Sequence, residues 1–113
     1  MELSTQTVSG LTIVTVTQPR IDASVAIRFK DAMRAITQTQ AQNVILDMSA
    51  VSFVDSSGLG AIVAALKQLG AGRKLHLAGL SGDVEKVFRL TRMDRIFEIH
   101  ASVEDAIAPR AAG

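Results

Sequence analysis

The residues best placed to do chemistry form a polar cluster, Asp55-Ser56-Ser57-Gly58, between two apolar segments. The segment before it, Val44-Ile45-Leu46, is typical of a strand buried on both faces. The segment after it predicts an amphipathic helix, with apolar residues at Leu59, Ile62, Val63, Leu66 and Leu69. Asp55 or Ser56 is the predicted N-cap. Because a helix N-terminus favours negative charge, a hydroxyl there is well placed to carry a phosphate. From the residues alone, a plain helix cap is the favoured interpretation.

Glycines follow the cluster closely. Gly58 and Gly60 remove side chains from the first helical turn, so we expect the backbone of another molecule to approach there. The run Gly58-Leu59-Gly60 lacks both the dinucleotide-binding pattern and the lysine of a phosphate-binding loop. Gly70 and Gly72 predict the end of the helix.

Two other chemistries would need histidine, and the chain has only His76 and His100. A serine nucleophile at Ser56 needs a base within reach, and no nucleophile-elbow pattern surrounds it. The two histidines and the scattered carboxylates show no metal-ligand spacing in the sequence. We therefore predict no catalytic residue and no metal site, and we interpret His76 as a partly buried strand residue.

A basic series occupies the C-terminal half, with a cation every three residues at Lys86, Arg89, Arg92 and Arg95. Such spacing places several of them on one side of a helix. Acidic residues interleave with the series, at Asp83, Glu85 and Asp94, so a solvated helix face is the favoured interpretation. A minor contribution to a partner interface is the alternative.

Composition bounds the class of protein. The 113 residues are 48% hydrophobic but only 4% aromatic, which predicts one domain with an aliphatic core. A net charge of +1 implies neither a nucleic-acid nor a membrane partner. The absence of cysteine excludes disulfides. With no signal peptide and no apolar run near the ~20 residues of a membrane span, we expect a cytoplasmic protein that is monomeric when free.

The remaining elements alternate between strand and helix. Residues 3–8 and 11–17 predict a hairpin around Ser9-Gly10, and residues 22–40 predict a helix capped by Asp22. Residues 74–80 predict a strand, Ser81 caps a helix, residues 97–99 predict a short strand, and Ser102 opens a last helix. The order β-β-α-β-α-β-α-β-α predicts an α/β fold with a mixed sheet, a hairpin plus parallel strands. We expect the domain to span residues 1–108 and residues 109–113 to form a disordered tail.

The run from Val44 to Gly60 closely resembles the signature of bacterial anti-sigma factor antagonists, the stand-alone STAS domains. The resemblance continues through residues 72–78 and 87–97 and covers essentially the whole chain. It implies a mixed sheet with helices packed mainly on one side. In that family the first serine after the aspartate is the regulatory phosphorylation site, which falls on Ser56 here. Some STAS domains bind nucleotides, so weak nucleotide binding remains open.

The resemblance also implies a partner-binding surface. It consists of Asp22, Asp55, Ser57, Gly58, Leu59 and Gly60. Asp22 matches the family pattern, whereas Pro19-Arg20 stands where the family usually has Gly and an acid, a change that could alter which kinase is recognised.

The function implied is a phosphorylation-controlled binding switch without a cofactor and without enzymatic activity. Unphosphorylated, the protein would sequester an anti-sigma factor, a serine kinase of the histidine-kinase-like ATPase fold, and so free a sigma factor. A PP2C-type phosphatase would reset the switch. The alternatives are a STAS scaffold, or a switch acting on a non-sigma target such as a stress complex, secretion or biofilm formation.

Overall fold

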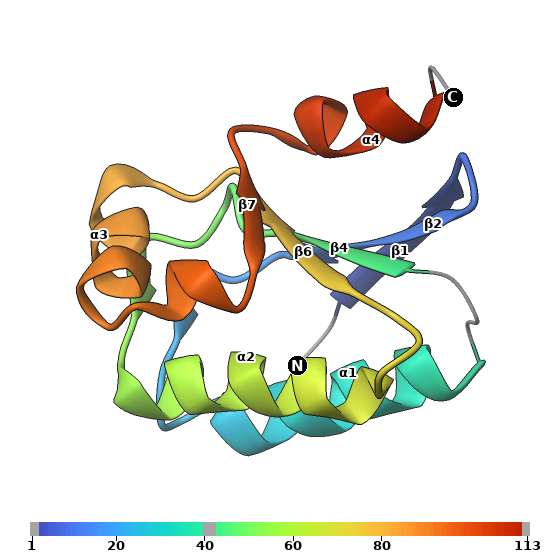
Figure 1. Ribbon diagram of the computed structural model, residues 1–113. Coiled ribbons are helices and arrows are strands. Elements are labelled where there is room, and N and C mark those ends of the chain that lie inside the picture. Colours follow the sequence, from blue (N-terminus) through green and yellow to red (C-terminus); the bar gives the residue numbers. More distant parts are fainter. Residues whose placement is uncertain (1–2, 40–42, 112–113) are drawn as a thin grey trace.

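A five-stranded mixed sheet in the order β1-β2-β4-β6-β7 forms the centre of the computed structural model, which describes residues 3–39 and 43–111 (Figure 1). In this sheet β1 and β2 pair antiparallel, and the other neighbouring strands pair parallel. The strands are β1 (Leu3–Val8), β2 (Leu11–Val16), β4 (Asn43–Asp47), β6 (Leu75–Ala78) and β7 (Glu98–His100). The predicted mixed sheet is therefore confirmed.

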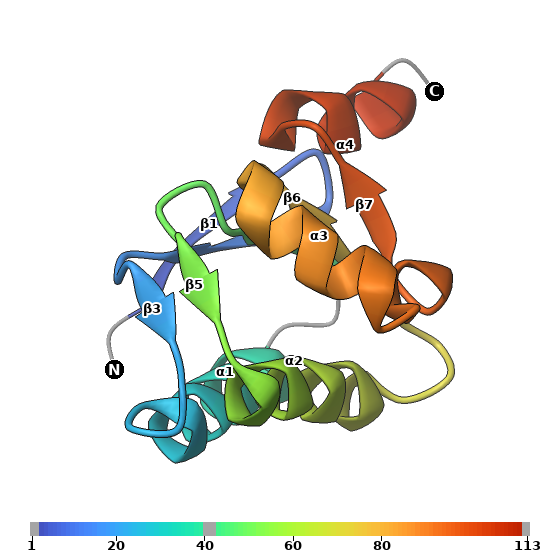
Figure 2. The same cartoon turned by 90° about the vertical axis from the view of Figure 1, so that its left-hand side faces the viewer.

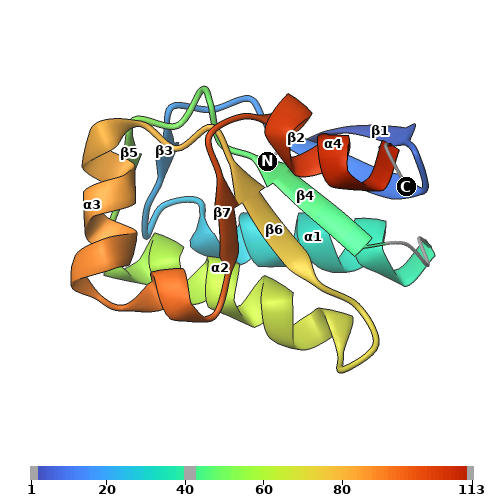
Figure 3. The same ribbon diagram turned by 45° about the horizontal axis from the view of Figure 1, so that its top comes forward.

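Helices cover the two faces of this sheet unequally. The larger core cluster joins one face of the sheet to α1 (Ala26–Thr39), α2 (Ser56–Leu69) and α3 (Gly82–Leu90). A smaller cluster joins the other face to α4 (Val103–Ala111) through Ala106. Figures 1 and 3 show α4 across the sheet from α1 and α2. The structure therefore confirms the prediction that the helices pack mainly on one side of the sheet.

The first turn follows the predicted hairpin. Val8 pairs with Leu11, and the two residues between them, Ser9 and Gly10, have φ of 52° and 76°. Two positive φ values suit the tight turn that matches the right-handed twist of paired strands. The hairpin therefore delivers β2 into the middle of the sheet, where Val14 and Val16 are fully buried.

A second, two-stranded sheet was not predicted. Strands β3 (Arg20–Ile21) and β5 (Phe53–Val54) pair in parallel and lead into α1 and α2 (Figure 2). The Pro19 carbonyl also accepts hydrogen bonds from the Ser52 and Phe53 N–H groups, at 2.8 and 3.2 Å. Two-residue strands leave no periodic pattern, so this pairing is visible only in three dimensions.

The first helix starts later than predicted. The Asp22 carboxylate accepts the Ser24 N–H at 3.1 Å and the Ser24 hydroxyl at 2.6 Å, so residues 22–25 form a turn. Asp22 is therefore not the N-cap of α1, because its side chain satisfies a local turn instead. The Val25 carbonyl accepts the first helical bond, from Phe29 N–H at 2.8 Å. The predicted end at Gln40 lies outside the described residues.

The C-terminal half keeps its predicted order with shifted boundaries. The sixth strand ends at Ala78 rather than Leu80, because Gly79 adopts a φ of 73°. Ser81 caps α3, a 3-10 helix η1 (Met93–Arg95) follows, and Ser102 accepts the Asp105 N–H at 3.1 Å. The predicted domain end at residue 108 falls inside α4, which continues through Pro109 to Ala111; residues 112–113 lie outside the described residues.

Candidate functional site

Asp55 joins the two segments that form the candidate site. Its Oδ1 accepts the Gly58 N–H at 2.8 Å and caps α2, as predicted. Its Oδ2 accepts the Ala23 N–H at 3.1 Å, in the turn that precedes α1. One carboxylate therefore fixes the start of α2 against the β3–α1 turn, 32 residues away in sequence.

The two serines after Asp55 are exposed. Ser56 and Ser57 are the first two residues of α2, and the Leu59 N–H closes the first turn onto the Asp55 carbonyl at 2.8 Å. Ser56 therefore presents its hydroxyl to solvent where the helix dipole is positive. Gly60 is also exposed, and Leu59 is half-buried against the main core.

Gly58 is buried and has a role within the fold. A Cβ atom at this position would lie 1.9 Å from the Ile21 carbonyl oxygen on β3. The chain's own backbone thus makes the close approach that we expected from another molecule. At Gly60 a Cβ would meet nothing within 4 Å, so that position stays open to a partner.

Asp22 lies beside this helix start, in the turn that Asp55 holds. The hydrogen bond from Ser24, and then that from Arg20, hold the pKa of the Asp22 carboxyl below its ordinary value. Arg20 Nε donates to Asp22 Oδ2 at 3.2 Å, and its guanidinium lies 4.1 Å from the centre of the Phe53 ring. The structure therefore brings the turn and the start of α2 into one surface.

The sequence prediction left two residues, Arg20 and Phe53, out of this surface. Arg20 is 57% exposed and Phe53 is 39% exposed, side by side on β3 and β5. A hollow of about 220 Å³ beside them is lined by Arg20, Asp22, Ser24 and neighbouring residues. A phenylalanine in a chain with few aromatics was the signal available, but Phe53 looks like a buried core residue when its strand is not recognised.

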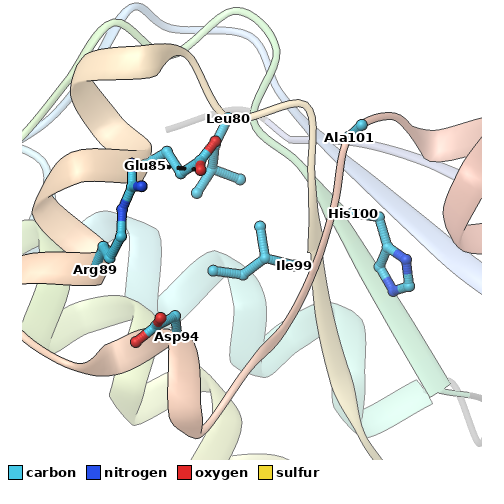
Figure 4. Close-up of a pocket in the computed structure, with 7 residues that line it drawn as sticks. All are labelled: Leu80, Glu85, Arg89, Asp94, Ile99, His100 and Ala101. Carbon is cyan, nitrogen blue, oxygen red and sulfur yellow. Dashed lines mark ion pairs between the residues drawn. The ribbon is translucent and has the colours of Figure 1, made fainter.

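The basic series does not form one helix stripe. Lys86 and Arg89 lie on α3, which ends at Leu90, while Arg92 has a left-handed φ of 61° and Arg95 belongs to η1. Arg89 pairs with Glu85 at 3.5 Å on the wall of a hollow of about 470 Å³ between α3 and β7 (Figure 4). None of the predicted site residues lines this hollow.

His76 is not partly buried as predicted, and the two histidines are not isolated from each other. His76 is fully buried, and its Nδ1 lies 3.2 Å from His100 Nε2 and 2.9 Å from Glu98 Oε2. His76 shares the sheet face of Ile45 and Ala78, which α4 covers, whereas Ser56 begins α2 on the other face. The histidines therefore lie across the sheet from the helix that carries Ser56.

Comparison with known proteins gives the family. A sequence model of the STAS domain matches residues 2–106. The chain belongs to the STAS family. The STAS chain is 35% identical over 80 residues to the anti-sigma-B factor antagonist of Listeria monocytogenes, covering 70% of each protein. This bears out the resemblance and the fold class inferred from the sequence.

Solved STAS structures share the fold. An anti-sigma factor antagonist from Mycobacterium paratuberculosis superposes with a TM-score of 0.85 at 22% identity, covering 97% of this chain and 93% of that one. The Bacillus cell fate determinant SpoIIAA, solved in a phosphorylated form, gives 0.67 at 20% identity, covering 96% and 98%. Among the described residues of this STAS domain, no helix combines the length and apolar character needed to span a bilayer.

Proposed function

We propose that this protein is an anti-sigma factor antagonist whose partner binding is switched off by phosphorylation of Ser56. The observation that carries the proposal is the exposed Ser56 hydroxyl at the start of α2, next to an aspartate that ties two surface segments together. The curated relative from Listeria, which bears the name of such an antagonist, supports it.

The binding surface would comprise both segments. We assign to it Asp22, Asp55, Ser57, Gly58, Leu59 and Gly60 from the sequence, and add the exposed Arg20 and Phe53. Gly58 contributes by letting β3 and α2 meet, since its own position is buried. Gly60 leaves room for a partner's backbone, because nothing lies within 4 Å of a Cβ placed there.

Phosphate would act locally at this surface. It adds about −1.5 to −2 charges at neutral pH, beside the Asp55 carboxylate and in the middle of the interface. Like charges brought together in an interface cost several kcal/mol, and 100-fold weaker binding needs only about 2.7 kcal/mol. The dipole of α2 would stabilise the phosphate in the free protein, so the fold should persist.

The partners follow from this role. The unphosphorylated protein would bind an anti-sigma factor that is also its serine kinase, of the histidine-kinase-like ATPase fold, and so release a sigma factor. A PP2C-type phosphatase would restore the binding form. The protein would act in the cytoplasm as a binding module and not as an enzyme.

The test uses the candidate anti-sigma kinase encoded in the same genome and isothermal calorimetry. We expect Ser56→Asp to weaken binding by 100-fold or more, and Ser56→Ala to bind like the unphosphorylated protein and to resist inactivation by kinase and ATP. Thermal unfolding should show both variants folded.

The matched control is Ser4→Asp, which adds the same charge at an exposed position on β1. It should bind like the parent protein. Tight binding by Ser56→Asp, or equal weakening by Ser4→Asp, would refute the switch.

A further inference from the structure

Three potential metal ligands meet on the sheet face that α4 covers. His76 lies on β6, and Glu98 and His100 lie on β7. In the parallel pairing His76 stands opposite Glu98 and Ala78 opposite His100, so all three side chains project from the same face. Their nearest ligand atoms all lie within 4.8 Å of one another.

Figure 4 shows the same separation of faces at the edge strand. Ile99 points into the hollow beside α3, and the His100 ring points away from it. His100 is among the residues that line the hollow, but its ring, which belongs to the cluster, points away from it. The cluster lies across the sheet from the helix that carries Ser56.

Protons alone satisfy this cluster poorly. His76 Nδ1 is within hydrogen-bond distance of both Glu98 Oε2, at 2.9 Å, and His100 Nε2, at 3.2 Å. A neutral imidazole nitrogen carries one proton at most, and a single proton cannot serve both contacts with good geometry. A proton on each of the two nitrogens would place two N–H groups head to head. A cation would let all three groups contribute a lone pair.

Two of the three ligand separations match a tetrahedral metal site, and the third, between Glu98 and His100, lies within 4.8 Å. Zn²⁺ binds histidine nitrogen and carboxylate oxygen at about 2.0–2.1 Å, so two ligands of one tetrahedral ion lie about 3.3 Å apart. The two separations at His76 Nδ1 are 3.2 and 2.9 Å. Two histidines with one carboxylate are a known zinc-binding set, and imidazole and carboxylate together favour a borderline transition metal over Mg²⁺ or Ca²⁺.

The cluster reaches from the buried core to the surface. The His76 side chain is 0% exposed and therefore held in place by packing, whereas the Glu98 side chain is 60% exposed and gives solvent and ions access. From this geometry we propose that His76, Glu98 and His100 bind one Zn²⁺ ion, with the fourth position open to water. Any proton on His76 Nδ1 or His100 Nε2 leaves to solvent when the ion binds. The site would join the edge strand β7 to β6.

The experiment titrates ZnCl₂ into metal-stripped protein without a histidine tag, by isothermal calorimetry. We expect one ion per chain and a rise in the midpoint of thermal unfolding, since a ligand that binds only the folded state stabilises it. Co²⁺ in place of Zn²⁺ should give the intense visible absorption of tetrahedral coordination.

Variants locate the ion. His100→Ala and Glu98→Gln alter the two less buried ligands, so both proteins should fold. Loss of an outer hydrogen-bond partner typically weakens a metal site by about 10–100-fold. Each of these variants loses a direct ligand, so each should weaken Zn²⁺ binding by more than that. Asp83→Asn, an exposed acid on α3, is the matched control and should bind like the parent.

Absence of Zn²⁺ binding by the parent protein would overturn the proposal. So would Zn²⁺ binding of unchanged affinity in both His100→Ala and Glu98→Gln, or a weak octahedral Co²⁺ spectrum. The result bears on this site alone, because the proposed switch involves none of its residues.

Discussion

Helices α2 and α3 both begin shortly after a strand and both have a side-chain N-cap, but the two caps make different hydrogen bonds. At α2 the cap is Asp55, which accepts one bond from its own helix at 2.8 Å and another from a distant turn at 3.1 Å. At α3 the cap is Ser81, which accepts a single bond at 3.4 Å. The first turn of α3 contains Asp83 and Glu85, whereas the first turn of α2 contains no acid.

This difference separates a structural helix start from one suited to carrying a signal. The carboxylates in the first turn of α3 already compensate its dipole. The first turn of α2 instead offers two exposed hydroxyls, on Ser56 and Ser57, and its cap is fixed by two segments of the chain. In the proposed switch, charge added at Ser56 would act on a surface that Asp55 ties together and on the partner bound to it.

The largest effect on folding is expected at Gly58. In Gly58→Ala the new Cβ would lie 1.9 Å from the Ile21 carbonyl oxygen, so β3 and α2 must separate. Overpacking of this kind lowers the free energy of unfolding by about 1–3 kcal/mol. We expect a loss near the upper end of that range, because the atoms nearest the new Cβ belong to the backbone and not to a flexible side chain. Urea unfolding measures the loss. Gly60→Ala and Gly82→Ala, where the Cβ meets nothing within 4 Å, are the controls in α2 and α3 and should not be destabilised. Equal stability of Gly58→Ala and Gly60→Ala would show that the two segments are not in tight contact.

Removing the α2 cap should have the next largest effect. Asp55→Ala leaves the Gly58 and Ala23 N–H groups without their carboxylate, so we expect a loss of about 2 kcal/mol, at the top of the range for N-caps. Thermal and urea unfolding measure it. Asp55→Asn keeps a capping oxygen and should recover most of the stability. A loss of only about 1 kcal/mol, typical of a simple cap, would mean that the bond to Ala23 contributes little.

The equivalent change at α3 should be milder. Ser81→Ala removes one long hydrogen bond, and Asp83 and Glu85 still favour the helix start, so we expect a loss of about 0.5 kcal/mol. The same unfolding measurements apply. A loss equal to that of Asp55→Ala would remove the contrast between the two helix starts.

The smallest effect concerns the acid side of the stability profile. The pKa of Asp22 is lower in the folded protein than the value of about 3.9 expected in the unfolded chain. Its ionised carboxylate therefore stabilises the folded state at pH values above about 3.9, and this stabilisation is lost as the pH falls through the folded pKa. An NMR titration should place the Asp22 midpoint below the unfolded value. Ser24→Ala should raise the midpoint more than Arg20→Ala does, because the Ser24 hydrogen bond is the larger cause. A midpoint unchanged by Ser24→Ala would contradict this assignment.

The sequence was sufficient to predict the elements with strong local patterns. The hairpin followed from Ser9-Gly10, β4 from its apolar run, and the start of α2 from Asp55. The β3–β5 pair escaped prediction because two-residue strands have no period, and with it the exposure of Phe53. The late start of α1 arises because the Asp22 carboxylate accepts hydrogen bonds in its own turn instead of capping the helix. The same residues are compatible with either arrangement, so the sequence could not distinguish them.

The histidine cluster was hidden for a different reason. Glu98 and His100 alternate correctly for one face of a strand, but nothing in the sequence gives their register against His76. Register between parallel strands depends on the whole sheet, and a shift of one residue would send these side chains to opposite faces.

The most direct test of the central claim is the position of phosphate on the protein purified from its own host. Intact-mass analysis followed by peptide mapping would give it. The account predicts a fraction of molecules that carry a single phosphate, on Ser56. Phosphate on Ser57 alone, or no phosphate under any growth condition, would contradict it.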